Sequence, residues 1–200
     1  MRKISIISIA SIMMLSLLFS SQLITAQTST PDPGYQLILA NGTLTSDKTF
    51  EFDLLILDTD PSNPFELALL QAGILVSPAF YANGTVTASI VEGSSQLIDE
   101  QKPMAIQFAQ AAGIVKIPSR TLKPLPKEAK PERRGTIISA KAPGTRICRI
   151  KLTNTTAFTK AMPGLAFNFA KLPYQTTVSQ YIDGMNTMLP CNEKTCVVKM

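Results

Sequence analysis

The amino-acid sequence predicts an all-β fold, an antiparallel β-sandwich of about nine strands. Short segments alternate between apolar and polar side chains, as in Thr49–Leu57, where Phe50, Phe52 and Leu54 fall on one side of an extended chain. Turn-forming residues separate such segments at close spacing. Patterns typical of amphipathic helices are scarce. Together, these three observations favour two packed antiparallel sheets.

Residues 1–26 have the features of a secretory signal peptide. Two basic residues precede the apolar run Ile4–Phe19, and the small residue Ala26 marks the expected cleavage point. The run contains serines and is short, whereas a membrane-spanning helix needs about 20 apolar residues. We therefore expect cleavage and export rather than a retained anchor, and no later segment is apolar enough to span a membrane. Residues 27–34 are expected to be a flexible lead-in.

The range 35–184 carries a series of strand patterns and is expected to form the sandwich. Most of these segments are rich in β-branched and aromatic residues and end near Gly, Pro or Asn. Phe65–Val76 also suits a helix by propensity, but Gly73 and Pro78 interrupt it and favour a strand. The other expected strands are Gln36–Ala40, Thr49–Leu57, Thr85–Val91, Met104–Gln110, Gly113–Ile117, Thr136–Lys141, Thr145–Leu152, Leu165–Ala170 and Thr177–Ile182. Residues 185–200 are expected to be a C-terminal tail.

Cations alternate with apolar residues in Thr145–Leu152, which raises the question of whether they form a binding site. Side chains of a strand alternate between its two faces. One face carries Cys148, Ile150 and Leu152, and the other carries Ile147, Arg149 and Lys151. Arg146 stands at the start of the strand, where it can reach water. We interpret these cations as the polar side of a half-buried strand.

Positive charge is concentrated in one proline-rich segment, residues 116–134. This stretch holds seven cations and two acids, whereas the chain as a whole has 19 basic and 14 acidic residues. Because the excess is local, the sequence does not resemble a general nucleic-acid binder. We expect a solvated loop between two strands. The alternative is a strip that attracts an anionic glycan or lipopolysaccharide surface.

The sequence disfavours most catalytic chemistries, because it contains no histidine. Serine or cysteine triads that use an imidazole base are therefore absent, as are histidine-ligated metals. Carboxylates remain available for glycoside hydrolysis at Asp53, Asp58, Asp60, Asp99 and Glu100. Asp53 falls on the polar face of a strand and the others fall in predicted turns. We expect no catalytic residues, no resident metal and no cofactor.

The turn Asp58–Pro64 offers oxygen ligands of the kind that calcium prefers, from Asp58, Asp60 and Asn63. The spacing does not fit the EF-hand loop, which has glycine at the sixth position, where Asn63 stands. Turn chemistry explains the same residues without a metal ion. We favour the turn.

The three cysteines are too few for a disulfide framework. Cys191 and Cys196 are candidates for one disulfide that closes a small loop after export. Cys148 is expected to be a buried, unpaired side chain on the core face of its strand.

Phe80 and Tyr81 precede the turn signal at Asn83 and are candidates for a ligand-binding aromatic pair at a sheet edge or loop tip. Sugar-binding sites commonly expose aromatic faces. The alternative is a packed corner, with the rings buried and the tyrosine hydroxyl wet.

Several of the strand segments together resemble one family. They are TFEFDLLILDT (49–59), FELA (65–68), QAGI (71–74), GTVTASIVEGSS (84–95), GTIIS (135–139) and APGTRICRIKLTN (142–154). The range 35–184 resembles the cohesin-like β-sandwich domains of large secreted proteins of Bacteroidetes-type bacteria, which are related in fold to some carbohydrate-binding modules. The resemblance implies an extracellular, non-enzymatic module of nine strands. Such proteins often end in a further β-rich sorting domain, for which the residues after Gly184 are too few.

These observations lead us to expect an exported, non-catalytic β-sandwich with a structural, adhesive or protein-interaction role at the cell envelope or outside the cell. The alternative is a carbohydrate-binding module. Envelope glycans or other surface proteins are the expected partners.

Overall fold

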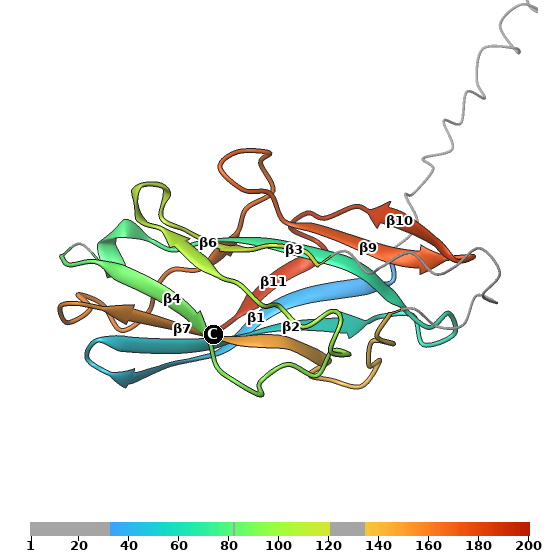
Figure 1. Ribbon diagram of the computed structural model, residues 1–200, viewed down its shortest axis with the longest axis horizontal. Helices are drawn as coiled ribbons and strands as arrows, with labels where there is room; N and C mark the ends of the chain where they lie inside the picture. Colours follow the sequence, from blue (N-terminus) through green and yellow to red (C-terminus); the bar gives the residue numbers. More distant parts are fainter. Residues whose placement is uncertain (1–32, 82, 121–134) are drawn as a thin grey trace, which may run out of the picture. The chain divides into compact units, whose positions relative to one another are not determined.

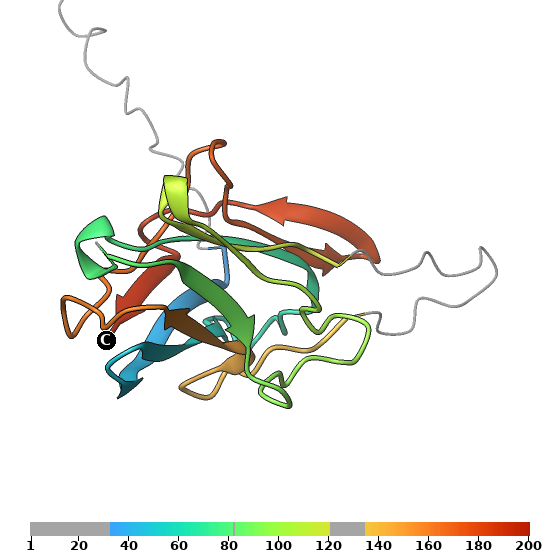
Figure 2. The same cartoon turned by 60° about the vertical axis from the view of Figure 1, so that its left-hand side comes forward.

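The computed structural model describes residues 33–81, 83–120 and 135–200, which form two β-sheets packed face to face (Figures 1 and 2). In these ranges there is no α-helix, only two short 3-10 turns, η1 (Pro78–Phe80) and η2 (Gln110–Ala112). The predicted β-sandwich is confirmed. The expected signal peptide, residues 27–32 of the lead-in and residues 121–134 of the basic loop lie outside the described residues.

The first sheet has the strand order β11-β1-β2-β7-β4. Its strands are β1 (Tyr35–Ser46), β2 (Thr49–Asp58), β4 (Val86–Ile90), β7 (Thr145–Asn154) and β11 (Cys196–Lys199). All neighbours are antiparallel except β11, which runs parallel to β1. The segment Thr49–Leu57 therefore lies at the centre of this sheet, and its alternation gives way after Asp53 to the apolar run Leu54–Leu57, of which Leu55 packs with Ile38 and Ala40 on the other face.

The second sheet has the order β10-β9-β3-β6-β5, and β8 also pairs with β3. Its strands are β3 (Leu67–Leu75), β5 (Gln107–Ala109), β6 (Ile114–Ile117), β8 (Ala166–Phe167), β9 (Thr177–Ile182) and β10 (Met185–Leu189). The ambiguous segment Phe65–Val76 is thus the central strand β3, as predicted. Position 73 of this strand requires glycine, because a Cβ atom there would lie 1.9 Å from the carbonyl oxygen of Tyr174.

The inner faces of the two sheets hold the core. Phe50, Phe52, Leu54 and Ile56, at alternate positions of β2, are fully buried. Phe50 meets Phe80 edge to face, with ring centroids 5.5 Å apart. Each fully buried side chain of this size contributes roughly 1.5–3 kcal/mol relative to exposure, so this apolar layer is what holds the sheets together.

The expected strand Thr136–Lys141 is not formed, apart from an isolated bridge between Ile137 and Glu66. Its backbone instead contacts both sheets in turn. Ile138 donates its N–H to the carbonyl of Phe65, and Ser139 accepts the N–H of Asp58. The segment closes one end of the sandwich, a role that its local pattern does not reveal.

The expectation of a tail over residues 185–200 is wrong, because this stretch contains β10 and β11. β10 forms a hairpin with β9, and β11 pairs with β1 in a register that matches Leu37 with Cys196. Cys196 is buried. Strands of four or five residues carry little periodicity, and the partner of β11 lies at the opposite end of the chain.

Removing residues 190–200 is therefore expected to lower the free energy of unfolding by at least about 2 kcal/mol. The truncation exposes the edge of β1 and deletes the 2.7 Å hydrogen bond from the Leu37 N–H to the Thr195 carbonyl. Urea denaturation measures the change, with Glu193→Ala, at an exposed position of the same segment, as the control. An unchanged urea midpoint for the truncated protein would contradict the placement of β11.

Candidate functional site

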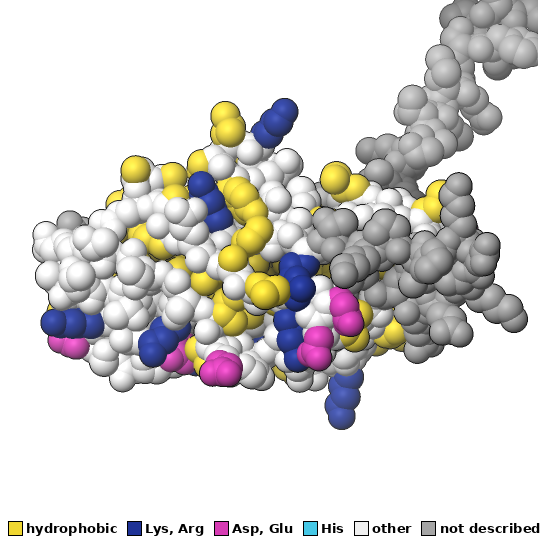
Figure 3. Space-filling view, in the orientation of Figure 1, with side chains coloured by type: hydrophobic (Ala, Val, Ile, Leu, Met, Phe, Trp, Pro, Cys, Tyr) yellow, Lys and Arg dark blue, Asp and Glu magenta, His cyan; other side chains and the backbone are white. Residues whose placement is uncertain are grey.

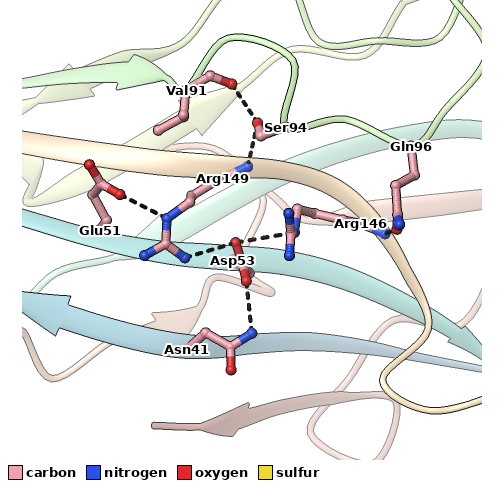
Figure 4. Close-up of polar contacts among 8 residues, drawn as sticks. All are labelled: Asn41, Glu51, Asp53, Val91, Ser94, Gln96, Arg146 and Arg149. Atoms are coloured by element: carbon pink, nitrogen blue, oxygen red, sulfur yellow. Dashed lines mark hydrogen bonds and ion pairs between the residues drawn. The ribbon is translucent and has the colours of Figure 1, made fainter.

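A buried carboxylate at the centre of the first sheet organises a cluster of ion pairs and hydrogen bonds (Figure 4). Asp53, on β2, is 1% exposed. Its Oδ1 atom lies 3.1 Å from Arg149 Nη1 and 3.3 Å from Arg146 Nε, and its Oδ2 atom accepts a 2.7 Å hydrogen bond from Asn41 Nδ2. Glu51, two residues away on the same face, accepts a 2.8 Å hydrogen bond from Arg149 Nε.

A bulge in β7 brings both arginines to the same carboxylate. The register shifts between Leu54 and Leu55, so that Cys148 pairs with Leu54 but Arg146 pairs with Leu55. Ile147 is the extra residue and is 1% exposed, so its predicted place on the polar face is wrong. The predicted core positions of Cys148, Ile150 and Leu152 are confirmed.

The loop after β4 holds this part of β7 in place. Arg149 donates its backbone N–H to Ser94 Oγ at 2.9 Å, and Ser94 Oγ in turn donates to the carbonyl of Val91. Arg146 donates its N–H to Gln96 Oε1 at 2.5 Å. The backbone of both arginines is therefore fixed independently of their ion pairs.

The arrangement stabilises the sheet and leaves little scope for catalysis. Burial acts to lower the pKa of Arg149, but hydrogen bonds and charge from Glu51 and Asp53 outweigh it, and the pKa is raised above its ordinary value. The guanidinium therefore stays cationic and keeps both carboxylates occupied. Asp53 shares its face of β2 with Glu51, as expected of a polar face, but its carboxylate is 1% exposed because Asn41 and the two arginines cover it, which leaves no open side toward a substrate.

The remaining candidate carboxylates lie apart from this cluster. Asp58 accepts the N–H groups of Asp60 and Phe65, at 2.8 and 3.1 Å, and Asp60 accepts from Ser62. These are turn hydrogen bonds, which confirms the turn chemistry expected of this segment. Asp99 binds the neighbouring Lys102, which lowers the pKa of its fully exposed carboxyl. Within the described ranges, no group of three or more His, Cys, Asp or Glu side chains has the arrangement of a metal site.

Replacing Asp53 with Asn is expected to lower the free energy of unfolding by about 2–3 kcal/mol, because two arginines lose their shared anion in a buried setting. Glu51→Gln, at a half-buried position, is the matched control and is expected to cost less than about 1 kcal/mol. Urea denaturation of both variants, and of Asp53→Asn combined with Arg149→Met, measures the coupling. Equal effects of the two single substitutions would contradict the central role of Asp53.

The aromatic pair Phe80 and Tyr81 is buried, so its predicted role as an exposed ligand-binding pair is not supported and the packed-corner alternative holds. Phe80 is 0% exposed and stacks on Phe158, with ring centroids 4.0 Å apart. Tyr81 is 7% exposed and meets Phe108 edge to face. The tyrosine hydroxyl contacts the carbonyl of Gln110 at 3.3 Å, and burial raises its pKa. The rings close one end of the core.

The structure brings the two candidate disulfide cysteines together. The sulfur atoms of Cys191 and Cys196 lie 3.0 Å apart, within about 1 Å of bonding distance. The hydrogen bond from Cys196 lowers the pKa of the Cys191 thiol, against the opposing effect of burial. Tyr35 donates its hydroxyl to the carbonyl of Pro190 at 2.7 Å, which fixes the same turn to β1. A thiolate at Cys191 is thus favoured beside its partner, and we expect a disulfide in the exported protein.

Thiol titration of exported, unreduced protein is expected to find no reactive thiol in the folded state and one after unfolding. That single thiol belongs to Cys148. It is unreactive in the folded protein because burial, with a smaller effect from the Asp53 charge, raises its pKa to about 12. After reduction, the folded protein should gain reactivity at Cys191 first. Three reactive thiols in unreduced, unfolded protein would contradict the disulfide.

A loop between β8 and β9, Asn168–Thr176, crosses the outer face of β3 and is held by its own side chains. Figure 1 draws this loop in orange, where it projects above the sheets. Asn168 Nδ2 donates to the carbonyls of Ala170 and Tyr174, at 3.1 and 2.9 Å. At its end, Thr176 exchanges hydrogen bonds with Gly73: the Gly73 N–H donates to Thr176 Oγ1, and this hydroxyl donates to the Gly73 carbonyl. We refer to this segment as the braced loop.

The braced loop presents an apolar side chain to solvent. Leu172 is 79% exposed, while Tyr174 beside it is half-buried, with Lys116 Nζ 5.8 Å from its ring centroid. Gln175 Nε2 donates to the Phe169 carbonyl at 3.0 Å, which ties the two sides of the loop together. No sequence pattern indicates this site, because the loop has no motif and the residue that anchors it, Gly73, lies 103 residues before Thr176.

The first five residues of the basic segment 116–134 lie within the described ranges. Lys116 belongs to β6 (Ile114–Ile117), in agreement with the expected strand Gly113–Ile117, so the expected loop over 116–134 begins after Ile117. Arg120 donates from Nη1 to the carbonyls of Asp99 and Lys102, at 2.8 and 3.2 Å. The nearby hollow lined by Leu67, Leu97 and Arg120 has room for little more than a water molecule.

In the parts that the structure describes, no helix is long and apolar enough to cross a membrane.

No family model matches the sequence, and no curated protein does. Among solved structures, the chain is similar to type II cohesin modules of Acetivibrio cellulolyticus. A chain from the crystal structure of a type II cohesin–X-dockerin complex, an N-terminal interface mutant, is 11% identical, covers 83% of this chain and 96% of its own, and has a TM-score of 0.44. The second type II cohesin module of the adaptor scaffoldin, with its long C-terminal linker, is 11% identical over 82% of this chain and 86% of its own, with a TM-score of 0.41.

A further crystal structure of that second module, 10% identical over 82% of this chain and 91% of its own, has a TM-score of 0.38. The solved structures are thus of the cohesin kind to which the sequence resemblance pointed, and they carry no information about a Bacteroidetes-type source. With TM-scores of 0.44 or lower the similarity is loose, so the proposals below rest on the residues of this chain.

Proposed function

We propose that this chain is an exported, non-catalytic β-sandwich that binds another protein, at the cell envelope or outside the cell, through the braced loop. The observation that carries the proposal is Leu172, a large apolar side chain that is 79% exposed in the middle of a loop whose two ends are fixed by hydrogen bonds. A fixed loop loses little conformational entropy on binding, and an exposed leucine gains from burial against a partner.

The surface around the loop suits a protein partner. In Figure 3, hydrophobic and basic side chains stand out at the top of the molecule, where Figure 1 draws the loop. A strip of hydrophobic side chains lies in the middle of the same face, with basic groups beside it. The fully buried core of a protein interface is more apolar than the rest of a protein surface, so the apolar side chains are the part of this face that favours a protein partner.

The non-catalytic assignment rests on how the reactive groups are used. Asp53 and Glu51 are occupied by Arg149, Asp58 is occupied by backbone N–H groups, and the thiol of Cys148 has a pKa of about 12. No histidine is available as a base. The hollow beside Arg120 is too small for an organic substrate.

Carbohydrate binding has less support in the structure. Within the described ranges, every aromatic side chain is buried or half-buried, whereas sugar sites commonly expose a ring. Export rests on the expected signal peptide and on the juxtaposed Cys191 and Cys196, which suit an oxidising compartment.

The test begins with a photo-crosslinking amino acid at position 172, or at the exposed position 193 as a control, in protein presented to the exported proteins of its source. We expect the crosslinker at position 172 to form a covalent adduct with one discrete protein, and the crosslinker at position 193 to form none. Leu172→Asp should then weaken the affinity for that partner at least about tenfold while leaving the thermal midpoint unchanged, since the side chain is exposed. Thr176→Val, which removes the hydrogen bonds to Gly73, should weaken binding as well by loosening the loop.

A partner bound equally well by Leu172→Asp would contradict the use of the braced loop. Pull-down of the same variants on insoluble polysaccharides is the parallel arm. Saturable binding there, unaffected by Leu172→Asp, would replace the proposal with a carbohydrate-binding module.

A further inference from the structure

β10 is an edge strand that the structure leaves open. It stands at the end of the second sheet, at the upper right of the sheets in Figure 1, and its ladder with β9 is continuous from Met185 to Leu189. Within the described ranges, no strand pairs with its other side. Met185 and Met188 are 68% and 69% exposed, and Ile182 beside them is 42% exposed.

The hairpin geometry shows which backbone groups of β10 are free. Asp183 and Gly184 form its two-residue turn, with φ of 50° and 76°, as in a type I′ turn. The residues flanking such a turn, Ile182 and Met185, form a hydrogen-bonded pair, and the pairs then alternate along the ladder. Asn186 and Met188 therefore direct their N–H and C=O groups away from β9.

β10 lacks the features by which proteins protect an edge strand, namely lysine, proline, a bulge or a cover. Its sequence, MNTML, has no charge, and its register with β9 is unbroken. The other edges differ. β11 carries Lys199, whereas β4 and β5 lie against each other, with Val86 donating its N–H to the Gln110 side chain.

We infer that β10 pairs with β10 of a second copy of this chain. The two strands are antiparallel and are related by a two-fold axis that passes midway between the two Thr187 residues. In this register Asn186 faces Met188 of the second copy, and each exchanges its free N–H and C=O with the other. Thr187 then faces Thr187 in a non-hydrogen-bonded pair, which agrees with the alternation derived from the turn. The two second sheets become one continuous sheet.

The sequence of β10 suits a partner identical to itself. On the side of the strand shared by Met185, Thr187 and Leu189, the two-fold axis matches Met185 with Leu189 and threonine with threonine, both favourable cross-strand pairs. No like charges are brought opposite each other, because the strand carries none. This inference does not depend on the braced loop, so either proposal can fail without the other.

Sedimentation velocity of exported protein, from about 1 µM to about 200 µM, should show a monomer–dimer equilibrium. Thr187→Lys and Thr187→Glu each place like charges opposite each other on the axis and should raise the dissociation constant at least about tenfold. Mixing the two variants should restore the dimer, since the charges are then opposite. Val198→Lys, on the β11 edge, is the control and should leave the equilibrium unchanged.

Hydrogen exchange of the unmodified protein provides a test that does not depend on whether the variants fold. Amides of Asn186 and Met188 should exchange more slowly at high protein concentration than at low concentration. The inference would be overturned by a protein that stays monomeric throughout the concentration range, or by a dimer that is insensitive to both Thr187 substitutions. It would also be overturned if the mixture of the two variants stays monomeric, or if hydrogen exchange at β10 is independent of protein concentration.

Discussion

The apolar layer between the two sheets is the interaction on which the rest of the molecule depends. Phe50, Phe52 and Ile56 on β2 pack across to β3 and the aromatic corner at Phe80. Because this layer is non-directional, it holds the sheets together without fixing how the strands of each sheet are aligned. The alignment needs directional contacts, and these are found in the polar clusters and the turns.

Asp53 supplies one such contact. A carboxylate that is 1% exposed is tolerated only if its oxygen atoms are paired, and the two strands beside β2 contribute the partners: Asn41 from β1, and Arg146 and Arg149 from β7. Shifting β7 by one residue would turn both arginines to the wrong face. The bulge at Ile147 thus lets one anion set the register of the first sheet.

With the interior and the register fixed by these contacts, the surface is free to carry function. The braced loop and the β10 edge are both peripheral to the core, and both expose apolar side chains that the fold does not require to be exposed. The loop is fixed by Asn168 and Thr176, while the edge is fixed by its ladder with β9. The two proposed contact surfaces are independent of each other, and together the proposals describe a module that assembles with other chains.

The sequence by itself determined the fold class, because period-two hydrophobicity depends only on neighbours along the chain. It placed β2, β3, β7 and β9 nearly at their observed positions, and it foresaw the buried Cys148 and the proximity of Cys191 and Cys196. The absence of histidine, also local information, disfavoured most catalytic centres.

Only the tertiary structure decided what depends on partners distant in sequence. β11 is a strand because β1 lies beside it, and Thr136–Lys141 is not one because its hydrogen bonds are divided between two sheets. The burial of Phe80 against Phe158, the convergence of two arginines on Asp53, and the support of the braced loop by Gly73 all join residues dozens of positions apart. Such contacts leave no periodic trace in the sequence, because the energy that selects them arises only when segments distant in the chain come together.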